Sequence, residues 1–227
     1  MLVLVAAALA APPATQLTSR GFAVGVAATG QAGEELLTDP DCVEGGACEA
    51  IRHHSGWGGQ LTLQVAPFVI GWVEGGTDEV KAPALEYEAA GFRVNGGVLG
   101  IVRPKQEIGG LGWANVDYGT SGNDSAAHAH RWVANVGGGA RFGRPDALLT
   151  SWVGAEVVVS GEDVTSTLTG ALDVPMQPTV PFNVVAGFQL FSAPLAGPGS
   201  DAPLLFLSCA GSAGSQLGVR FSLGAAL

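Results

Sequence analysis

Apolar residues recur at every second position along several short segments of the chain. In 217–227, LGVRFSLGAAL, the apolar residues Leu217, Val219, Phe221 and Leu223 share one parity, and the residues between them, such as Arg220, are small or polar. Successive side chains of a β-strand point to opposite faces, so this segment predicts a strand with one apolar face and one small or polar face. The same two-residue period recurs at 22–29, 57–65, 131–142 and 182–190.

These segments are short and are separated by clusters of Gly, Pro, Asn and Asp, while stretches with the helical period are essentially missing. Such a pattern is typical of an all-β sandwich or barrel. No repeat of fixed length is visible, which disfavours a propeller or a solenoid. The expected fold class is therefore all-β.

The connections between the segments divide into long and short ones. The long connections are 32–56, 119–129 and 161–180, and the short ones are 103–109 and 143–146. In bacterial membrane barrels the long connections lie outside the cell, and the short turns lie in the periplasm together with both termini. We therefore expect the first set at one end of a barrel and the second set at the other.

Two further turns are needed for an even number of strands. Asn95-Gly96 has the strongest two-residue hairpin signal and is expected to divide 83–103 into two strands. Gly211-Ser-Ala-Gly214 is expected to divide 203–227 in the same way. The prediction is an antiparallel up-and-down transmembrane β-barrel of about ten strands, with eight strands as the alternative if neither segment is divided.

The composition supports a membrane barrel. Charged residues make up only 13% of the chain and the mean hydropathy is +0.33, whereas about a quarter of the residues of an ordinary soluble domain are charged. Yet no internal run approaches the roughly 18 apolar residues of a membrane helix. A membrane barrel needs this combination, because only every second residue of a strand contacts lipid. The net charge of -10 argues against nucleic-acid binding, which needs a basic surface.

Residues 1–10 are expected to be a secretory signal peptide, and 11–227 the barrel domain. The apolar core Leu2–Leu9 is too short to span a membrane, and Ala8-Leu9-Ala10 has the small-x-small pattern of a cleavage site. Export to an oxidising compartment favours a disulfide between Cys42 and Cys48, which lie close together in an acidic segment. Cys209 lies in an apolar segment and is expected to pack as a small hydrophobic residue.

Strand parity sends charged residues of both signs toward the inside of the expected barrel: Glu86, Glu88, Asp117, Arg131, Arg141, Glu156 and Arg220. The interior of a small barrel is narrow enough for side chains to fill it. We therefore expect these groups to close the interior through buried ion pairs. A polar passage for a small solute is the alternative.

Aromatic and cationic residues fit the ends of the expected strands. Aromatic residues form a girdle at the two membrane interfaces of many membrane barrels. Four aromatic residues of this chain lie near predicted strand ends, as such a girdle requires: Trp57, Trp113, Tyr118 and Trp132. Ordinary core packing is the alternative, since Trp152 lies in mid-strand. Lys81 and Lys105 both fall in predicted periplasmic turns, away from lipid.

Histidines are the only candidates for a metal site. His53 and His54 fall in one predicted outer loop, and His128 and His130 in another, so they are weak candidate ligands for a transition metal that require the two loops to meet. No recognised ligand spacing supports them, and we expect neither a metal nor a cofactor.

The sequence contains no motif of an enzyme. Ser125 precedes His128 by three residues, but a Ser/His pair in a polar loop is too common to indicate a hydrolase. Gly137-Gly-Gly139 lacks the Lys-Ser/Thr and the helix of a phosphate-binding loop. These glycines are expected to make room for bulky neighbours inside the barrel.

The segment containing Leu217, Val219, Phe221 and Leu223 resembles the C-terminal signal of bacterial outer-membrane barrels, with Leu227 at the position where an aromatic residue is usual. In layout, the chain resembles the small outer-membrane β-barrels of the OmpA/OmpX/opacity-protein type. The resemblance implies an outer-membrane location, lipid contact for those four side chains, insertion by the barrel-assembly machinery through the closing strand, and a monomer. It also implies a non-enzymatic structural or surface-interaction role with outward-facing loops.

Two other functions stay open. One is a small-solute channel, and the other is a soluble secreted barrel that binds an apolar ligand. A soluble barrel would turn its apolar face inward and carry many Lys and Glu residues outside. The low charge content of this chain favours the membrane barrel.

Overall fold

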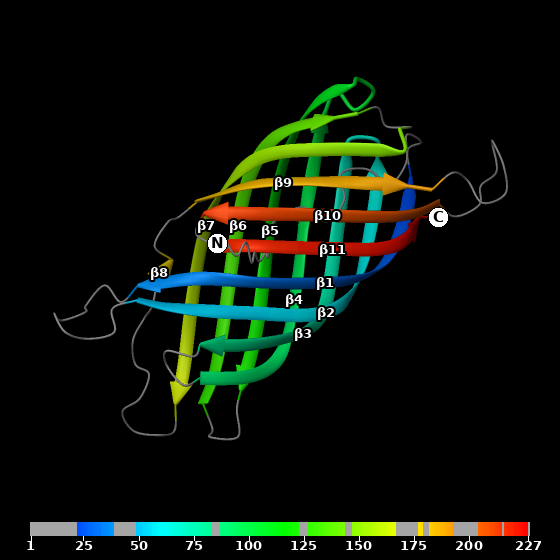
Figure 1. Ribbon diagram of the computed structural model, residues 1–227. Helices are drawn as coiled ribbons and strands as arrows, with labels where there is room; N and C mark the ends of the chain where they lie inside the picture. Colours follow the sequence, from blue (N-terminus) through cyan, green and yellow to red (C-terminus); the bar gives the residue numbers. More distant parts are fainter. Residues whose placement is uncertain are drawn as a thin grey trace, which may run out of the picture.

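The computed structural model describes residues 22–38, 49–82, 87–122, 127–143, 147–166, 177–178, 182–192, 204–214 and 216–226. Ten long antiparallel strands close a barrel, and a short strand lies at its rim (Figure 1). The strands are β1 (Ala23–Thr38), β2 (Glu49–Ala66), β3 (Val69–Ala82), β4 (Tyr87–Val102), β5 (Ile108–Gly122), β6 (Ala127–Phe142), β7 (Leu149–Ser166), β8 (Gln177–Pro178), β9 (Phe182–Phe191), β10 (Leu204–Gly214) and β11 (Gln216–Ala226).

The barrel has up-and-down topology. Each long strand pairs with its neighbours along the chain, and β11 closes the barrel onto β1 from Gly25↔Ala226 to Glu35↔Gln216. The short strand β8 pairs with the end of β1. The predicted all-β class, the antiparallel up-and-down barrel and the count of ten strands are confirmed. In the described ranges, no helix is long and apolar enough to cross a membrane.

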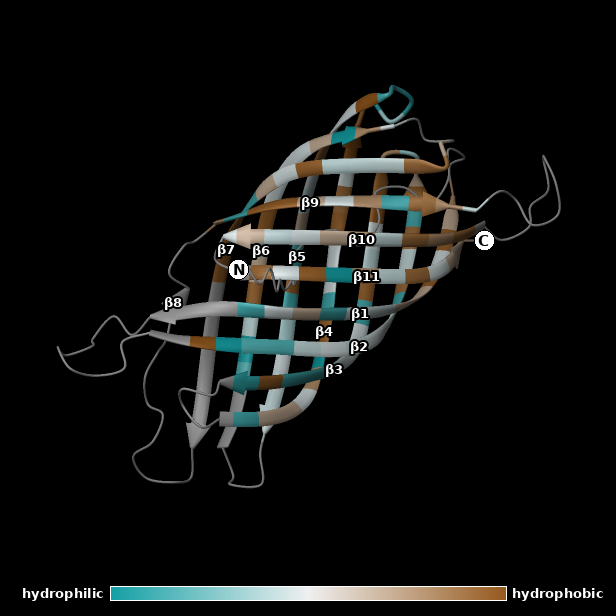
Figure 2. Ribbon diagram, in the orientation of Figure 1, coloured by the Kyte–Doolittle hydropathy of each residue, from teal (hydrophilic) through white to brown (hydrophobic). Residues whose placement is uncertain are grey.

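Alternation along the strands gives the barrel an apolar outside and a largely polar inside. In β11, Val219, Phe221 and Leu223 are exposed, whereas Arg220 and Ser222 are buried. The hydropathy changes from one residue to the next along this strand in Figure 2. The period of two in the sequence therefore corresponds to two faces of one closed sheet.

The connections expected to be long and those expected to be short lie at opposite ends of the barrel. Because the strands alternate in direction, the connections β1–β2, β3–β4, β5–β6, β7–β9 and β10–β11 share one end, here called the loop end. The turns after β2, β4 and β6 lie at the other end with the start of β1 and the finish of β11, here called the terminal end. The strands reach farther than the sequence indicated, since β1 continues to Thr38 and β2 begins at Glu49.

The hairpin predicted at Asn95-Gly96 is wrong. Strand β4 is continuous from Tyr87 to Val102, and Asn95 faces Glu74 on β3 and Asp117 on β5. The side chain of Asn95 is hydrogen-bonded inside the barrel, and these contacts override the local preference for a turn. The predicted number of strands is right even though one of the turns on which it depended does not exist.

The turn predicted at Gly211–Gly214 is displaced by a few residues. These residues belong to β10, and the chain reverses between Gly214 and Gln216. Gly214 has φ of 149°, and a Cβ there would lie 2.2 Å from the carbonyl oxygen of Phe182. Glycine is therefore required at the end of β10, where the strand turns.

The two lysines lie at opposite ends of the barrel, contrary to the prediction. Lys105 lies in the turn after β4, at the terminal end, whereas Lys81 lies near the end of β3, at the loop end. No turn was expected between Ala66 and Val69, where β2 ends and β3 begins, and this missed reversal placed Lys81 at the wrong end; the false hairpin at Asn95-Gly96 then restored the direction of the later strands.

Three tryptophans fill the interior near the terminal end. Trp72, Trp113 and Trp152 are only 3–6% exposed and pack with aliphatic side chains of β3, β4, β5, β9 and β10. Each indole lies over a glycine directly opposite on the next strand: Gly97, Gly137 and Gly187. The predicted role of Gly137, which was to make room for a bulky neighbour, is confirmed.

Candidate functional site in the barrel interior

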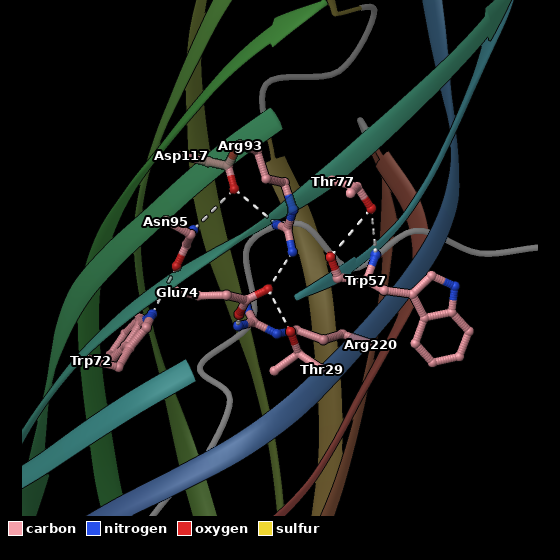
Figure 3. A network of polar contacts seen from close by, with 9 residues as sticks. All are labelled: Thr29, Trp57, Trp72, Glu74, Thr77, Arg93, Asn95, Asp117 and Arg220. Carbon is pink, nitrogen blue, oxygen red and sulfur yellow. Dashed lines mark hydrogen bonds and ion pairs between the residues drawn. The ribbon is translucent and has the colours of Figure 1, made fainter. Parts of the chain in front are cut away.

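Glu74 of β3 lies at the centre of a buried polar network (Figure 3). Its Oε1 accepts hydrogen bonds from Thr29 Oγ1, at 3.0 Å, and from Arg93 Nη2, while its Oε2 contacts Arg220 Nη2. Strand alternation brings these side chains inward from β1, β4 and β11. Arg220 therefore reaches Glu74 across the interior, past the two strands that separate β11 from β3.

Asp117 extends this network to β5. Its Oδ2 accepts hydrogen bonds from Arg93 Nη1, at 3.1 Å, and from Asn95 Nδ2, at 3.2 Å. Asn95 Oδ1 in turn accepts a hydrogen bond from the Trp72 indole nitrogen at 2.8 Å. The central network, from Trp72 to Arg220, thus alternates carboxylates with guanidinium groups, and its two negative and two positive charges balance.

Such a balance is what makes buried charges tolerable. A lone ion in a barrel interior would lose its hydration without compensation, and breaking a buried pair typically costs about 3–5 kcal/mol. Here the side chains of Glu74, Arg93 and Arg220 are at most 3% exposed. Side chains of four strands contact one another at the level of Glu74, so they fill the barrel interior there.

The interior residues selected from the sequence fall into several places. Asp117 and Arg220 belong to the central network, in which Arg220 pairs with Glu74. Glu156 and Arg141 are buried elsewhere, and Arg131 faces inward with partial exposure. Glu86 lies outside the described residues.

Arg141 binds the turn at the terminal end. Its Nη2 donates hydrogen bonds to the carbonyl oxygens of Pro104 and Gln106, both at 3.0 Å. These acceptors belong to the turn between β4 and β5, so Arg141 of β6 satisfies backbone groups of that turn from inside the barrel.

The prediction that Glu88 points inward is wrong. Glu88 shares parity with the exposed residues of β4, and its carboxylate lies 2.6 Å from Lys81 Nζ on the outer surface near the loop end. The false hairpin caused this error. It made the segment before Asn95 a separate strand, so the inward face of that segment was assigned independently of the residues after Gly96. The hydrogen bond and the charge of Glu88 raise the pKa of Lys81.

Four members of the central network were missed by sequence reasoning: Trp72, Glu74, Arg93 and Asn95. Glu74 follows Ile70 and Trp72 at the two-residue period, and this pattern would have placed it inside had β3 been treated as a strand. Arg93 and Asn95 were hidden by the assumed hairpin. Their interior position follows once β4 is extended unbroken to Val102.

Three of the four girdle aromatics lie on the outside of the barrel, and the fourth does not. Trp57, Tyr118 and Trp132 are exposed on the outer face, toward the loop end of their strands. Tyr118 and Trp132 face each other across β5 and β6. The girdle prediction is wrong for Trp113, which points inward and is 3% exposed. Trp113 has the same parity as the buried Asp117 on β5, and its indole nitrogen donates a hydrogen bond to a buried carboxylate.

The histidines lie in strands and not in loops. His53 faces outward and contacts Glu34 at 3.2 Å, whereas His54, the next residue of β2, faces inward and contacts Asp78 at 3.5 Å. Adjacent strand residues point to opposite faces, so these two imidazoles cannot converge on one metal.

The histidines of β6 add no metal cluster. His130 Nδ1 lies 3.1 Å from the Tyr118 hydroxyl, and the side chain of His128 lies outside the described residues. Within the described ranges, no three metal-ligating side chains gather at one point. Ser125, the partner proposed for His128, also lies outside those ranges.

The remaining sequence-derived candidates have simple positions. Leu217, Val219, Phe221 and Leu223 all lie on the outer face of β11, with Leu217 partly buried. Cys209 of β10 is a free, partly buried thiol on the same face. The residues 1–21, with the expected signal peptide, and the expected disulfide partners Cys42 and Cys48 lie outside the described ranges.

Searches by sequence add no relatives to this picture. No protein-family model and no curated protein sequence matches the chain. The fold and the interior chemistry therefore carry the functional argument.

Proposed function

We propose that this chain is an integral membrane β-barrel of the bacterial outer-membrane type, with a structural or surface-interaction role and no enzymatic activity. The supporting observation is the polarity of its two faces. Large apolar side chains are exposed on the outside of all ten long strands, with exposed fractions of 36–68%. One such residue from each strand is Val26, Leu61, Val73, Val94, Val116, Val136, Val153, Val184, Leu205 and Phe221.

This surface is unsuited to water. Apolar surface costs about 25 cal/mol for each Å² left in water, and soluble monomers rarely expose contiguous apolar patches larger than a few hundred Å². Hydrocarbon removes this cost. The inside, in contrast, holds the charged groups that a bilayer would exclude.

The height of the apolar surface also fits a bilayer. On β5 the outward residues from Ile108 to Tyr118 are apolar or aromatic, and Thr120 follows. A transmembrane β-strand needs about 9–11 residues, which matches this length. Trp57, Tyr118 and Trp132 mark the loop-end border of the band, where aromatic side chains favour the interface.

The two alternatives fit the structure less well. A soluble barrel around an apolar ligand would need its apolar face inside, which is the reverse of the observed polarity. A small-solute channel would need an open passage, whereas the paired side chains of Glu74, Arg93 and Arg220 meet in the middle of the interior. These contacts favour a structural or surface-interaction role, in which the filled barrel holds its loops at one membrane surface.

The proposed partners follow from this location. Outer-membrane lipid surrounds the apolar band, and the barrel-assembly machinery inserts the chain through β11. The protein acts as a monomer. Each of its ten long strands pairs with a strand on both sides, so the closed barrel offers no free strand edge with which a second copy could pair.

Membrane fractionation tests the proposal, with a matched pair of variants on β6. Val136 lies midway along the outward apolar residues of this strand, so Val136→Arg places a charge in hydrocarbon at a cost of about 2–4 kcal/mol and should abolish accumulation in the outer membrane. His130→Arg lies on the same face beyond Trp132 and should insert normally. The folded protein should also migrate differently in gels before and after heating. A wild-type chain that is folded and soluble without detergent would overturn the proposal.

A further inference from the structure

Glu156 of β7 is a buried carboxylate whose hydrogen-bond donors are both neutral. Its Oε2 accepts a hydrogen bond from the Trp113 indole nitrogen and its Oε1 from Asn183 Nδ2, each at 3.0 Å. Its side chain is among the largest that are fully buried in the described part of the barrel. Within the described residues, no Lys or Arg forms an ion pair with it, and the guanidinium groups of Arg93 and Arg220 are bound to the carboxylates of the central network.

Two asparagines with unpartnered amides lie beside Glu156. Asn115 and Asn135 face each other directly across β5 and β6, and both point into the barrel, with exposed fractions of 4% and 0%. Within the described residues, neither the oxygen nor the nitrogen of either amide has a hydrogen-bond partner. Directly opposed residues of this kind have Cβ atoms about 4.5–5.5 Å apart, so the two amides share one space.

The strand register places Glu156 next to this pair. Glu156 lies opposite Gly137, which is two residues from Asn135 on the same inner face of β6. Such diagonal neighbours are about 7–8 Å apart between Cα atoms, within reach of a Glu and an Asn side chain around one small ligand. The indole of Trp113 lies over Gly137 and donates its hydrogen bond to Glu156, so this ring borders the carboxylate beside the two amides.

A buried carboxylate without a counter-charge and two buried amides without partners are each unfavourable. All three occur together on neighbouring strands, whereas the charges of the central network beside them are balanced. One ligand with a positive charge and a preference for oxygen would satisfy the carboxylate and both amide oxygens at once.

We propose that Asn115, Asn135 and Glu156 bind a small monovalent cation inside the barrel. Carboxylate and amide oxygens are the protein ligands of hard alkali cations, and a single carboxylate matches a single positive charge. A divalent ion would require further carboxylates. Asp117, two residues from Asn115 on the same inner face of β5, is already bound to Arg93 and Asn95.

The neighbouring hydrogen bonds position the carboxylate for this role. Trp113 and Asn183 each donate to a different oxygen of Glu156, which fixes the plane of the carboxylate while leaving a lone pair on each oxygen available. Trp113 is itself fixed by its contact with Gly137. The competing occupant is a proton on Glu156, which would remove the charge without any metal ion.

The experiment compares sodium with a cation too large for the site. The midpoint of thermal unfolding of the full chain, folded in lipid or detergent, is measured in rising NaCl and in N-methyl-D-glucamine chloride at equal ionic strength. Sodium should raise the midpoint by several degrees and in a saturable way, because a ligand that binds only the folded state stabilises it. Glu156→Gln should abolish the difference between the two salts. Glu79→Gln, on the exposed outer face near the loop end, should keep it.

Sodium-23 NMR gives a second readout that does not depend on unfolding. The wild-type barrel should broaden the sodium resonance at millimolar concentration. Asn135→Leu, which is used if Glu156→Gln does not fold, should remove the excess broadening. Equal midpoints in both salts, together with no broadening by the wild-type protein, would overturn the proposal and assign a proton to Glu156.

Discussion

Trp113 of β5 faces Gly137 of β6 directly across the ladder, and its indole fills the space that a side chain of residue 137 would need. A Cβ at Gly137 would lie 2.5 Å from the ring. The same relationship recurs at three other cross-strand pairs: Trp72–Gly97, Trp152–Gly187 and, on the outer face, Phe221–Gly30. Because each ring needs its own glycine, a shift of register by one residue would break the contact, so these pairs specify how the strands align.

Substitution of Gly137 by alanine should destabilise the barrel. The added methyl group must displace an indole that is packed against Trp152, at a ring distance of 6.0 Å, and hydrogen-bonded to Glu156. Overpacking of this kind typically costs about 1–3 kcal/mol. Urea unfolding of the protein in micelles, followed by tryptophan fluorescence, should show a lower midpoint.

A neighbouring glycine provides the control for this variant. Gly112 of β5 points outward, and the atom nearest to an added Cβ would be 4.0 Å away, so Gly112→Ala should leave the midpoint nearly unchanged. Trp113→Leu combined with Gly137→Ala should lose less stability than the sum of the single changes. Strict additivity of the two losses would contradict the proposed contact.

Loss of Glu74 should be more damaging than loss of Arg220. Glu74→Gln leaves the buried guanidinium of Arg220 without a carboxylate and leaves Arg93 with Asp117 alone, whereas Arg220→Gln leaves Glu74 still paired with Arg93. Removal of one partner of a buried pair costs about 3–5 kcal/mol, so Glu74→Gln, which leaves the charge of Arg220 uncompensated, should fall in that range and exceed the loss for Arg220→Gln. Equilibrium unfolding in urea measures both values. Equal losses for the two variants would show that Glu74 is not the centre of the network.

The acidic loop provides a prediction about export. Cys42 and Cys48 are expected to be joined in the mature protein, because the compartment is oxidising and the closed loop is short. Mass spectrometry of non-reduced peptides should find the two cysteines linked, with Cys209 as a free thiol. Free thiols at both positions in protein isolated from the envelope would contradict the disulfide and weaken the argument for export.

The period of two could be read from the sequence because each strand has one face in each environment. Leu217, Val219, Phe221 and Leu223 could be assigned to one face without knowing any partner strand, and the structure places all four outside. This assignment depends on local alternation, which a sequence shows directly. The count of ten strands, in contrast, was reached through a hairpin at Asn95-Gly96 that does not exist.

The interior contacts could not be read in this way, because they depend on which strands meet across the barrel. Parity indicated that Arg220 points inward, but its partner Glu74 is supplied by a strand more than a hundred residues earlier. Trp113 shows the same limitation. Its position near a strand end suggested an interface, although it has the same parity as Asp117, which was expected inside; the register adds Gly137 and the carboxylate of Glu156 as its partners.

The sequence Asn95-Gly96 allows one substitution to test the corrected topology. Asp-Gly is about as favourable as Asn-Gly in a two-residue hairpin, so Asn95→Asp would be nearly silent if these residues formed a turn. In the barrel, Asn95 Nδ2 donates to Asp117 Oδ2 at 3.2 Å, and the new carboxylate would face an acceptor with the same charge. Asn95→Asp should therefore lower the free energy of unfolding by about 2–3 kcal/mol at neutral pH, through the lost hydrogen bond and the buried like charge. Thr120→Asp, which adds the same charge on the outer face beyond the aromatic border, should have little effect. A normal unfolding midpoint for Asn95→Asp would return the turn to residues 95–96 and remove both Arg93 and Asn95 from the interior.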